Sequence, residues 1–226
     1  MPPRAQVVLE PRKSPIQARS VASIDAILKA TIQVLLQVGK ERLTTTKVAI
    51  RAGVSVGTLY QYFPNKRALL QAALKRHLTE VAEAVELVCR EQEGRTLRQM
   101  AALITAFLHA KMRVAQTSIA LYSVSSDVDG AKIVQEIGSR FHKAIVRMLR
   151  TASKPFATDP QLFAAMLQAS MSGVVRILLD SSTPEPQFDA WREELIFVAY
   201  SYLDACSART LVQGADAAGI ARIPAN

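Results

Sequence analysis

The chain has 226 residues, of which 50% are apolar and 21% are charged, and this composition excludes an intrinsically disordered protein. Its two cysteines, Cys89 and Cys206, are too few for a disulfide framework or a cysteine-based metal site, so we expect two buried thiols in a reducing compartment. Because the sequence shows neither a signal-peptide pattern nor a run of about 18 apolar residues, we expect a cytoplasmic protein.

Charge is distributed unevenly along the chain, whose formal net charge is +9. Up to Leu78 there are 13 Lys and Arg residues and 3 Asp and Glu residues, whereas the remainder has 15 and 16. A basic segment suits binding to a polyanion, because each phosphate that it neutralises releases counterions from DNA or RNA. Charge alone leaves open the alternative of a solvated basic surface without a partner.

The beginning of the chain combines a polar arm with a first helix. Residues 1–19 contain four prolines among basic side chains, which predicts a flexible basic arm. Apolar residues such as Ile24, Leu28 and Leu35 then recur at helical spacing. This pattern predicts an amphipathic helix that begins near residue 20 and stops at Gly39.

Two short helices with a tight turn are predicted next. Thr44 or Thr45 can cap the first helix, and Gly53 suits the left-handed position that ends it. Ser55 can cap the second helix, which Pro64 then breaks. Two short helices joined by a glycine turn and packed on a preceding helix form a helix-turn-helix, the second helix of which enters the major groove of DNA.

The outward residues of this unit are the candidates for contact with DNA. Gln61 can pair with a base edge, the hydroxyl groups of Thr58 and Tyr62 suit phosphates, and Tyr60 is expected in the core or at its edge. Lys66, at the start of the next helix, is unfavourable for the helix dipole unless it meets a phosphate. The predicted DNA-binding set is Thr45, Thr46, Lys47, Ser55, Gly57, Thr58, Gln61, Tyr62 and Lys66.

The rest of the chain shows helical periodicity and no strand pattern. Further helices are expected over about residues 69–88, 97–112, 117–126, 133–149, 160–182 and 188–203. Asp159 and Pro160 suit the cap and the first position of one of them. The small residues after Arg209 predict a flexible tail over 210–226. The sequence therefore predicts an all-α fold of about nine helices, with an N-terminal three-helix DNA-binding domain and a larger C-terminal helical domain.

The segment LTTTKVAIRAGVSVGTLYQYFPNKRALL, from Leu43 to Leu70, resembles the N-terminal DNA-binding domain of TetR-type transcriptional repressors. It shares their order of Thr-Thr, Ala-Gly-Val-Ser, Gly-Thr-Leu-Tyr-x-Tyr-Phe and x-Lys, and the resemblance extends from about Ser20 to Leu78. It implies a homodimer that binds a palindromic DNA operator, usually as a repressor, and that a small molecule in the helical body releases. The long basic arm departs from many members; it either follows the minor groove or is flexible.

On this basis we predict a DNA-binding domain over residues 20–66 and an effector-binding and dimerisation domain over 67–209. The dimer surface is expected on the last two long helices, where small residues permit close approach and aromatic residues suit an interface. The residues that carry this expectation are Ala169, Ser170, Ser172, Gly173, Trp191, Phe197 and Tyr202. An ordinary intramolecular core is the alternative.

A ligand pocket for an apolar or aromatic effector is expected among bulky and adaptable side chains of the central helices. The candidates are Phe107, Met112, Tyr122, Phe141, Met166 and Met171, with His109, Arg113 and Gln116 as possible polar anchors. Plain core packing is the alternative for each of them.

Two other classes of function are alternatives to this prediction. The histidines His77, His109 and His142 stand alone, and no catalytic or phosphate-binding motif occurs, so neither an enzyme nor a bound cofactor or metal is expected. An activator or architectural factor that binds DNA without a small-molecule effector remains the alternative to a ligand-responsive repressor. The sequence does not specify the effector, the operator or the regulated genes.

Overall fold

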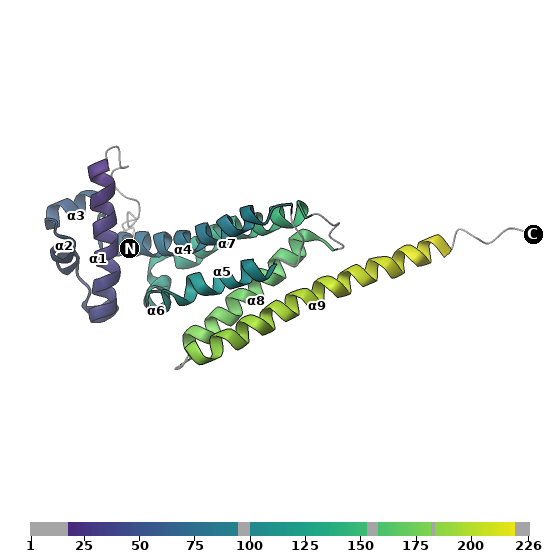
Figure 1. The fold of residues 1–226 in the computed structure, drawn as a ribbon. Helices are drawn as coiled ribbons and strands as arrows, with labels where there is room; N and C mark the ends of the chain where they lie inside the picture. The colour runs from purple at the N-terminus through teal and green to yellow at the C-terminus, as the bar shows by residue number, and fades with distance from the viewer. Residues whose placement is uncertain (1–17, 95–99, 153–157, 182–183, 220–226) are drawn as a thin grey trace, which may run out of the picture. The chain divides into compact units, whose positions relative to one another are not determined.

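The computed structural model describes residues 18–94, 100–152, 158–181 and 184–219. Within these ranges the regular structure consists of nine α-helices and one short 3-10 helix, without a strand, which confirms the predicted all-α fold (Figure 1). Nearly all of the predicted N-terminal arm, residues 1–17, and the last part of the predicted tail, residues 220–226, lie outside the described residues.

The chain divides into two compact units that do not follow the order of the sequence. Unit 1 comprises residues 1–80 and 114–137, and unit 2 comprises residues 81–113 and 138–226. Two long helices, α4 (Lys66–Glu91) and α7 (Gly130–Arg150), contribute residues to both units. The predicted domain boundaries after residues 19, 66 and 209 stay a prediction.

Unit 1 contains the predicted helix-turn-helix. The helix-turn-helix is formed by α2 (Thr45–Ala52) and α3 (Val56–Tyr62). Besides parts of α4 and α7, the unit also contains α1 (Ala18–Arg42), α6 (Ala115–Ser123) and the 3-10 helix η2 (Ser125–Val128). Figure 1 shows α2 and α3 packed beside α1, whose buried residues include Ile27 and Leu35. Leu43, Leu59 and Phe63, each at most 2% exposed, complete this core.

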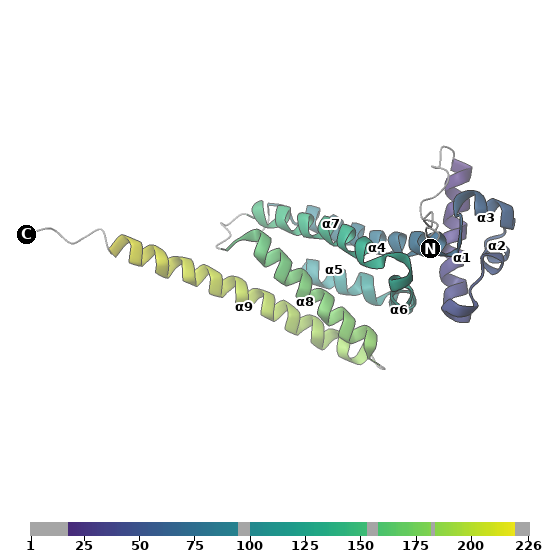
Figure 2. The same cartoon turned by 180° about the vertical axis from the view of Figure 1, so that it is seen from behind.

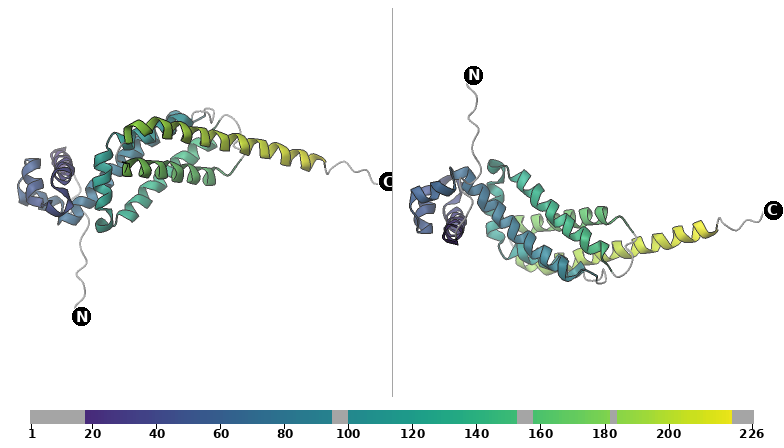
Figure 3. Two further views of the ribbon diagram at one scale, coloured as in Figure 1. Left: turned by 90° about the horizontal axis from the view of Figure 1, so that it is seen from below. Right: turned by 90° about the horizontal axis from the view of Figure 1, so that it is seen from above.

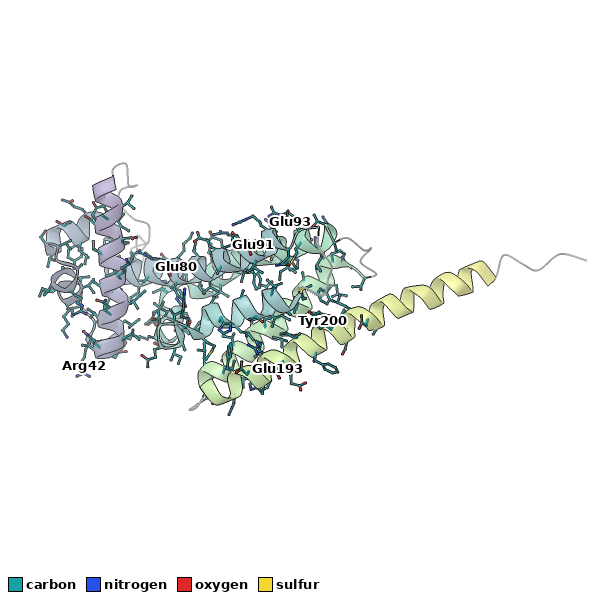
Figure 4. All side chains as sticks on the ribbon, in the orientation of Figure 1. Arg42, Glu80, Glu91, Glu93, Glu193 and Tyr200 are labelled. Atoms are coloured by element: carbon teal, nitrogen blue, oxygen red, sulfur yellow. The ribbon has the colours of Figure 1, made fainter. Side chains whose placement is uncertain are left out.

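Unit 2 is a helical bundle formed by α5 (Met100–Met112), α8 (Pro160–Asp180), α9 (Pro184–Gly219) and parts of α4 and α7. Helices α8 and α9 lie side by side in Figure 2, and both pack against α5 in the core. Arg140 forms two hydrogen bonds with Glu86, and Arg147 pairs with Glu93, labelled in Figure 4, so that α7 is fixed to the end of the α4 segment. Burial of Cys89 in this core raises the pKa of its thiol to about 12.

Helix α9 is longer than the sequence predicts. It begins at Pro184 rather than near Phe188, and it continues to Gly219 as one helix that extends past α8 (Figure 3). Prolines fit its first turn because the N–H groups there have no partner within the helix. The predicted tail over residues 210–226 is helical as far as Gly219, and its flexibility stays a prediction.

The connection between α6 and α7 is tightly packed. Asp129 adopts a left-handed conformation with φ 54°, which is uncommon for a residue other than glycine. Gly130 is buried, and a Cβ atom at this position would lie 2.6 Å from both the Cβ atom and the carbonyl oxygen of Ser125. Only glycine fits here, because a methyl group would displace main-chain atoms.

We therefore expect Gly130→Ala to lower the free energy of unfolding by about 1–3 kcal/mol through overpacking. Denaturant unfolding of the variant measures this change. The matched control is Gly57→Ala in the first turn of α3, where the added Cβ atom meets only Ser55 Oγ at 3.7 Å. That control is expected to be neutral or stabilising by about 0.5–1 kcal/mol, and equal losses at both positions would contradict the packing argument.

Candidate nucleic-acid interface

Helix α2 is capped as the sequence predicts. Thr44 precedes the helix in an extended conformation, and its side-chain oxygen accepts the N–H of Lys47 at 3.3 Å. Val48 and Ala49 are buried, whereas Thr46 and Lys47 are exposed and Thr45 is half-buried. The first turn of α2 therefore presents two hydroxyl groups, one amine and free backbone N–H groups to the surface.

The turn between α2 and α3 also follows the prediction. Gly53 has φ 68° and ψ 30°, a left-handed conformation that glycine adopts without steric cost. The N–H of Val54 donates to the carbonyl of Ala49 at 3.0 Å, which closes the end of α2. Ser55 then caps α3, since its Oγ accepts the N–H of Thr58 at 2.9 Å and also shares a hydrogen bond with the Thr58 hydroxyl.

Helix α3 has one buried face and one open face. Leu59 is completely buried, whereas Ser55, Gly57 and Gln61 are exposed. Thr58 and Tyr62, the other two predicted DNA contacts on this helix, are half-buried. Ser55, Gly57 and Gln61 are small or polar, so this part of the surface can approach a phosphate backbone and base edges closely.

Gly57 is the least expected residue in this helix. Glycine inside a helix costs about 0.5–1 kcal/mol relative to alanine. Within the part of the chain that the structure describes, neither packing nor conformation requires it, because an added Cβ atom would have ordinary contact with Ser55 alone and the backbone there is helical. The absence of a side chain is consistent with close approach by a molecule outside the chain.

Tyr60 is a surface residue that the sequence analysis placed in the core or at its edge. The structure leaves 40% of it exposed, and its hydroxyl group shares a hydrogen bond of 3.0 Å with Thr45 Oγ1. Tyr60 therefore joins α3 to the first turn of α2 at the surface. Its spacing from Val56 and Phe63 suggested burial, and no local signal in the sequence indicates the bond to Thr45.

The two lysines of the predicted DNA-binding set have partners within the unit. Lys47 Nζ donates to the carbonyl of Arg42 at 2.9 Å, and Lys66 Nζ donates to the carbonyl of Lys40 at 2.7 Å. Both carbonyls belong to the end of α1, where the helix dipole is negative (Arg42 is labelled in Figure 4). Because an ammonium group has three N–H donors, each lysine keeps donors for a phosphate.

Acidic residues from later in the sequence neutralise part of the basic charge of unit 1. Its described ranges contain 11 Lys and Arg residues and 6 Asp and Glu residues. Three ion pairs bring these later acids to the basic helices, namely Lys40–Asp127, Arg67–Asp129 and Lys75–Glu136. The excess positive charge of unit 1 is therefore smaller than the first 78 residues suggest.

Comparison with known proteins identifies the family. Residues 27–73 match the model described as bacterial regulatory proteins of the tetR family. Residues 96–203 match the model described as the tetracyclin repressor-like C-terminal domain. The chain belongs to the TetR family. Its helix-turn-helix lies in the first matched region, and most of unit 2 lies in the second.

Relatives of known sequence include transcriptional repressors. The TetR-family chain is 31% identical over 142 residues to the transcriptional repressor KstR of Rhodococcus jostii, a match that covers 62% of this chain and 64% of that protein. It is 44% identical over 55 residues to the class C tetracycline repressor protein of Escherichia coli, which covers 24% of this chain and 25% of that repressor. The chain thus spans less than two thirds of the length of these curated relatives.

Solved structures share the fold. One, described as a TetR-family transcriptional regulator from Mesorhizobium loti, superimposes with a TM-score of 0.69 at 14% identity, over 82% of this chain and 98% of that chain. SmeT of Stenotrophomonas maltophilia, the repressor of a multidrug efflux pump, gives a TM-score of 0.60 at 19% identity, over 81% of this chain and 91% of that chain. At these identities the likeness concerns the fold alone.

The predicted effector-pocket residues do not all lie together. Phe107 and Phe141 stack in the core of unit 2 with ring centroids 5.3 Å apart, Met171 is completely buried there, and Met112 packs against the same core. Met166 is 46% exposed on α8. Tyr122 belongs to unit 1 and is 40% exposed. Four of the six candidates therefore share one core, and the pocket stays a prediction.

Substitution of Ser55 separates its cap from its contact with DNA. Ser55→Ala is expected to lower the free energy of unfolding by about 1 kcal/mol, because Thr58 N–H loses its acceptor. Ser55→Asp retains a cap, so its free energy of unfolding is expected to lie within about 0.5 kcal/mol of that of the wild type. Its carboxylate repels phosphates, however, and is expected to lower the affinity for DNA. Denaturant unfolding and fluorescence anisotropy with duplex DNA measure the two effects. Unchanged DNA affinity of Ser55→Asp would place Ser55 away from the DNA.

Proposed function

We propose that this TetR-family protein is a homodimeric transcriptional repressor that binds a palindromic operator and is released by a small apolar or aromatic effector. The observation that carries the proposal is the capped helix-turn-helix whose open face presents Thr46, Lys47, Ser55, Gly57 and Gln61. A surface of hydroxyl, amine, amide and bare backbone groups matches the phosphates and base edges of the major groove.

The remaining predicted contacts have distinct tasks in this proposal. Gln61 binds a base edge, while Lys66 and the hydroxyl groups of Thr58 and Tyr62 bind phosphates. We add Tyr60 to the predicted set, because its exposed ring and its bond to Thr45 place it on the same surface. Such a protein acts in the cytoplasm, on the nucleoid when it is bound to DNA.

The apolar outer face of α8 and α9 supports the homodimer. Helix α8 is rich in apolar residues, yet several of them are not covered within the described part of the chain. Leu162, Met166 and Ile177 are about half exposed on α8, and Phe197 and Val198 are 66% and 56% exposed on α9. A second copy would cover these side chains, since exposed apolar groups on neighbouring helices suit an interaction site.

The residues predicted for the dimer interface differ in their exposure. Ala169, Ser170, Ser172 and Gly173 are exposed, which leaves room for close approach of a partner helix. Trp191 and Tyr202, in contrast, pack against the core of unit 2, and Tyr202 stacks on Phe163. Of the three predicted interface aromatics, only Phe197 is therefore exposed. Glu193, labelled in Figure 4, adds an exposed charge to α9.

Release by an effector requires a ligand that binds one conformation of the dimer better than the other. We place this effector in unit 2, among Phe107, Met112, Phe141 and Met171, because these side chains share an apolar core. Repression is the proposed sign of regulation, because both KstR and the tetracycline repressor protein are named as repressors.

Selection of duplexes from a random library by the purified dimer tests the proposed function. We expect enrichment of a palindrome with half-sites about one helical turn apart, and affinity that falls steeply with salt. Gln61→Ala is expected to relax the preference at one base pair per half-site at a cost of about 1–3 kcal/mol. Lys66→Gln, which keeps an N–H donor for the carbonyl of Lys40, is expected to weaken binding to all DNA sequences by the same factor. No enrichment, or binding that salt does not change, would refute the proposal.

The dimer surface has its own test. Phe197→Glu is expected to destabilise the dimer by at least about 2 kcal/mol, because it places a charge at the most exposed aromatic of the apolar face. Analytical ultracentrifugation measures the oligomeric state, and the loss of dimer is expected to reduce binding to the two-half-site operator. Leu87→Glu is the control, since Leu87 is 49% exposed on α4, outside α8 and α9. A dimeric Phe197→Glu protein would place the interface elsewhere.

A further inference from the structure

The segment between α6 and α7 presents two aspartates to α1 and to α4, the helix that begins with Lys66 of the candidate DNA surface. We name residues 125–130 the acidic corner; it comprises η2, Asp129 and Gly130. Its backbone is fixed by its own packing, because Val128 is completely buried and Gly130 leaves no room for a Cβ atom against Ser125. The carboxylates of Asp127 and Asp129 are therefore held on a rigid support.

The acidic corner accepts hydrogen bonds from the first two turns of α4. Arg67 Nη2 donates to Asp129 Oδ2 at 3.0 Å, and Gln71 Nε2 donates to the carbonyl of Val128 at 3.1 Å. Arg67 and Gln71 lie four residues apart and thus on one face of the helix. Lys66, the predicted phosphate contact, directly precedes Arg67.

The acidic corner also holds the end of α1. Asp127 Oδ2 lies 2.6 Å from Lys40 Nζ, and this hydrogen bond raises the pKa of Lys40. Lys40 follows Gly39, whose φ of 72° and ψ of 172° interrupt the helix. The carbonyl of the same Lys40 accepts the hydrogen bond from Lys66 Nζ. Asp127 thus binds the side chain of the residue whose main chain binds Lys66.

We propose that Asp127 and Asp129 are positioning residues for DNA binding, which hold Lys40 and Arg67 and thereby fix Lys66 where it meets a phosphate. This inference rests on the proposed DNA-binding function. Each aspartate acts on one side of Lys66: Asp127 fixes the carbonyl that Lys66 binds, and Asp129 fixes the helix start from which Lys66 projects. The acidic corner thereby links α6 and α7 to a DNA contact.

The proposal predicts an effect opposite in sign to simple electrostatics. Removal of a negative charge near a DNA-binding surface by itself strengthens attraction to phosphates. Loss of positioning instead weakens binding, because Lys66 must then be ordered at the moment when DNA binds. The direction of the change in affinity therefore decides between the two effects.

The experiment compares the full-length wild type with Asp127→Asn, Asp129→Asn and the double variant on the selected operator. We expect each single variant to bind the operator about fivefold to tenfold more weakly. We also expect the slope of log affinity against log salt to decrease in magnitude by the amount that corresponds to about one phosphate contact. Glu136→Gln is the matched control: it also removes one negative charge from unit 1, and its partner Lys75 lies nine residues after Lys66 on α4. It is expected to bind as tightly as the wild type or more tightly.

A second comparison tests whether the aspartates act through Lys66. In the Lys66→Gln background, Asp127→Asn is expected to cause no further loss of affinity and no further change in the salt slope. Thermal unfolding, recorded for every variant, ensures that binding is compared between folded proteins, and Asp127→Glu is expected to restore part of the affinity by restoring the ion pair. Equal or tighter binding by Asp127→Asn and Asp129→Asn, or additive losses with Lys66→Gln, would overturn the inference.

The outcomes separate this inference from the proposed function. If the wild type selects no operator, the proposed function fails. If the wild type, Gln61→Ala and Lys66→Gln behave as expected while the aspartate variants bind like Glu136→Gln, only the positioning of Lys66 by the acidic corner fails.

Discussion

The end of helix α1 is the point on which unit 1 depends. Gly39 interrupts this helix, and the carbonyls of Lys40 and Arg42 that follow accept hydrogen bonds from Lys66 of α4 and Lys47 of α2. Charged donors at the negative end of a helix are favourable, and a hydrogen bond to a charged group is stronger than one between neutral groups. Three helices are thus fixed around one helix end by the same lysines that we assign to phosphates, so the ammonium groups are already ordered before DNA binds.

Three glycines of unit 1 show how conformation, packing and contact can be distinguished. Gly53 has a left-handed backbone, which a side chain would strain, and Gly130 lies against main-chain atoms of Ser125. Gly57 has neither constraint, since its backbone is helical and its neighbourhood is open. A glycine that the fold does not require weakens the helix. Gly57 is therefore better explained by what approaches α3 from outside than by the folding of the chain.

The sequence predicted the features that depend on residues close together in the chain. The caps at Thr44 and Ser55 each accept an N–H three residues later, and such bonds follow from local residue order. The ion pair between Lys40 and Asp127 and the bond between Lys66 and Lys40 join distant segments, which no local pattern indicates. Periodicity identified apolar positions, but it could not tell that Met166 is exposed or that Tyr122 belongs to unit 1, because both depend on how helices pack.

The pairing of basic residues also affects how such a protein can be regulated. A surface with all of its positive charge free would bind any DNA through counterion release, and a modest change of shape would hardly displace it. In unit 1, Asp127, Asp129 and Glu136 neutralise three cations. With the DNA contacts that we propose, a larger share of the affinity would then depend on the geometry of α3 and Lys66. An effector changes affinity by a coupling free energy of about 1–3 kcal/mol. Such a coupling can release a contact that depends on geometry, whereas it leaves a purely electrostatic attraction nearly intact.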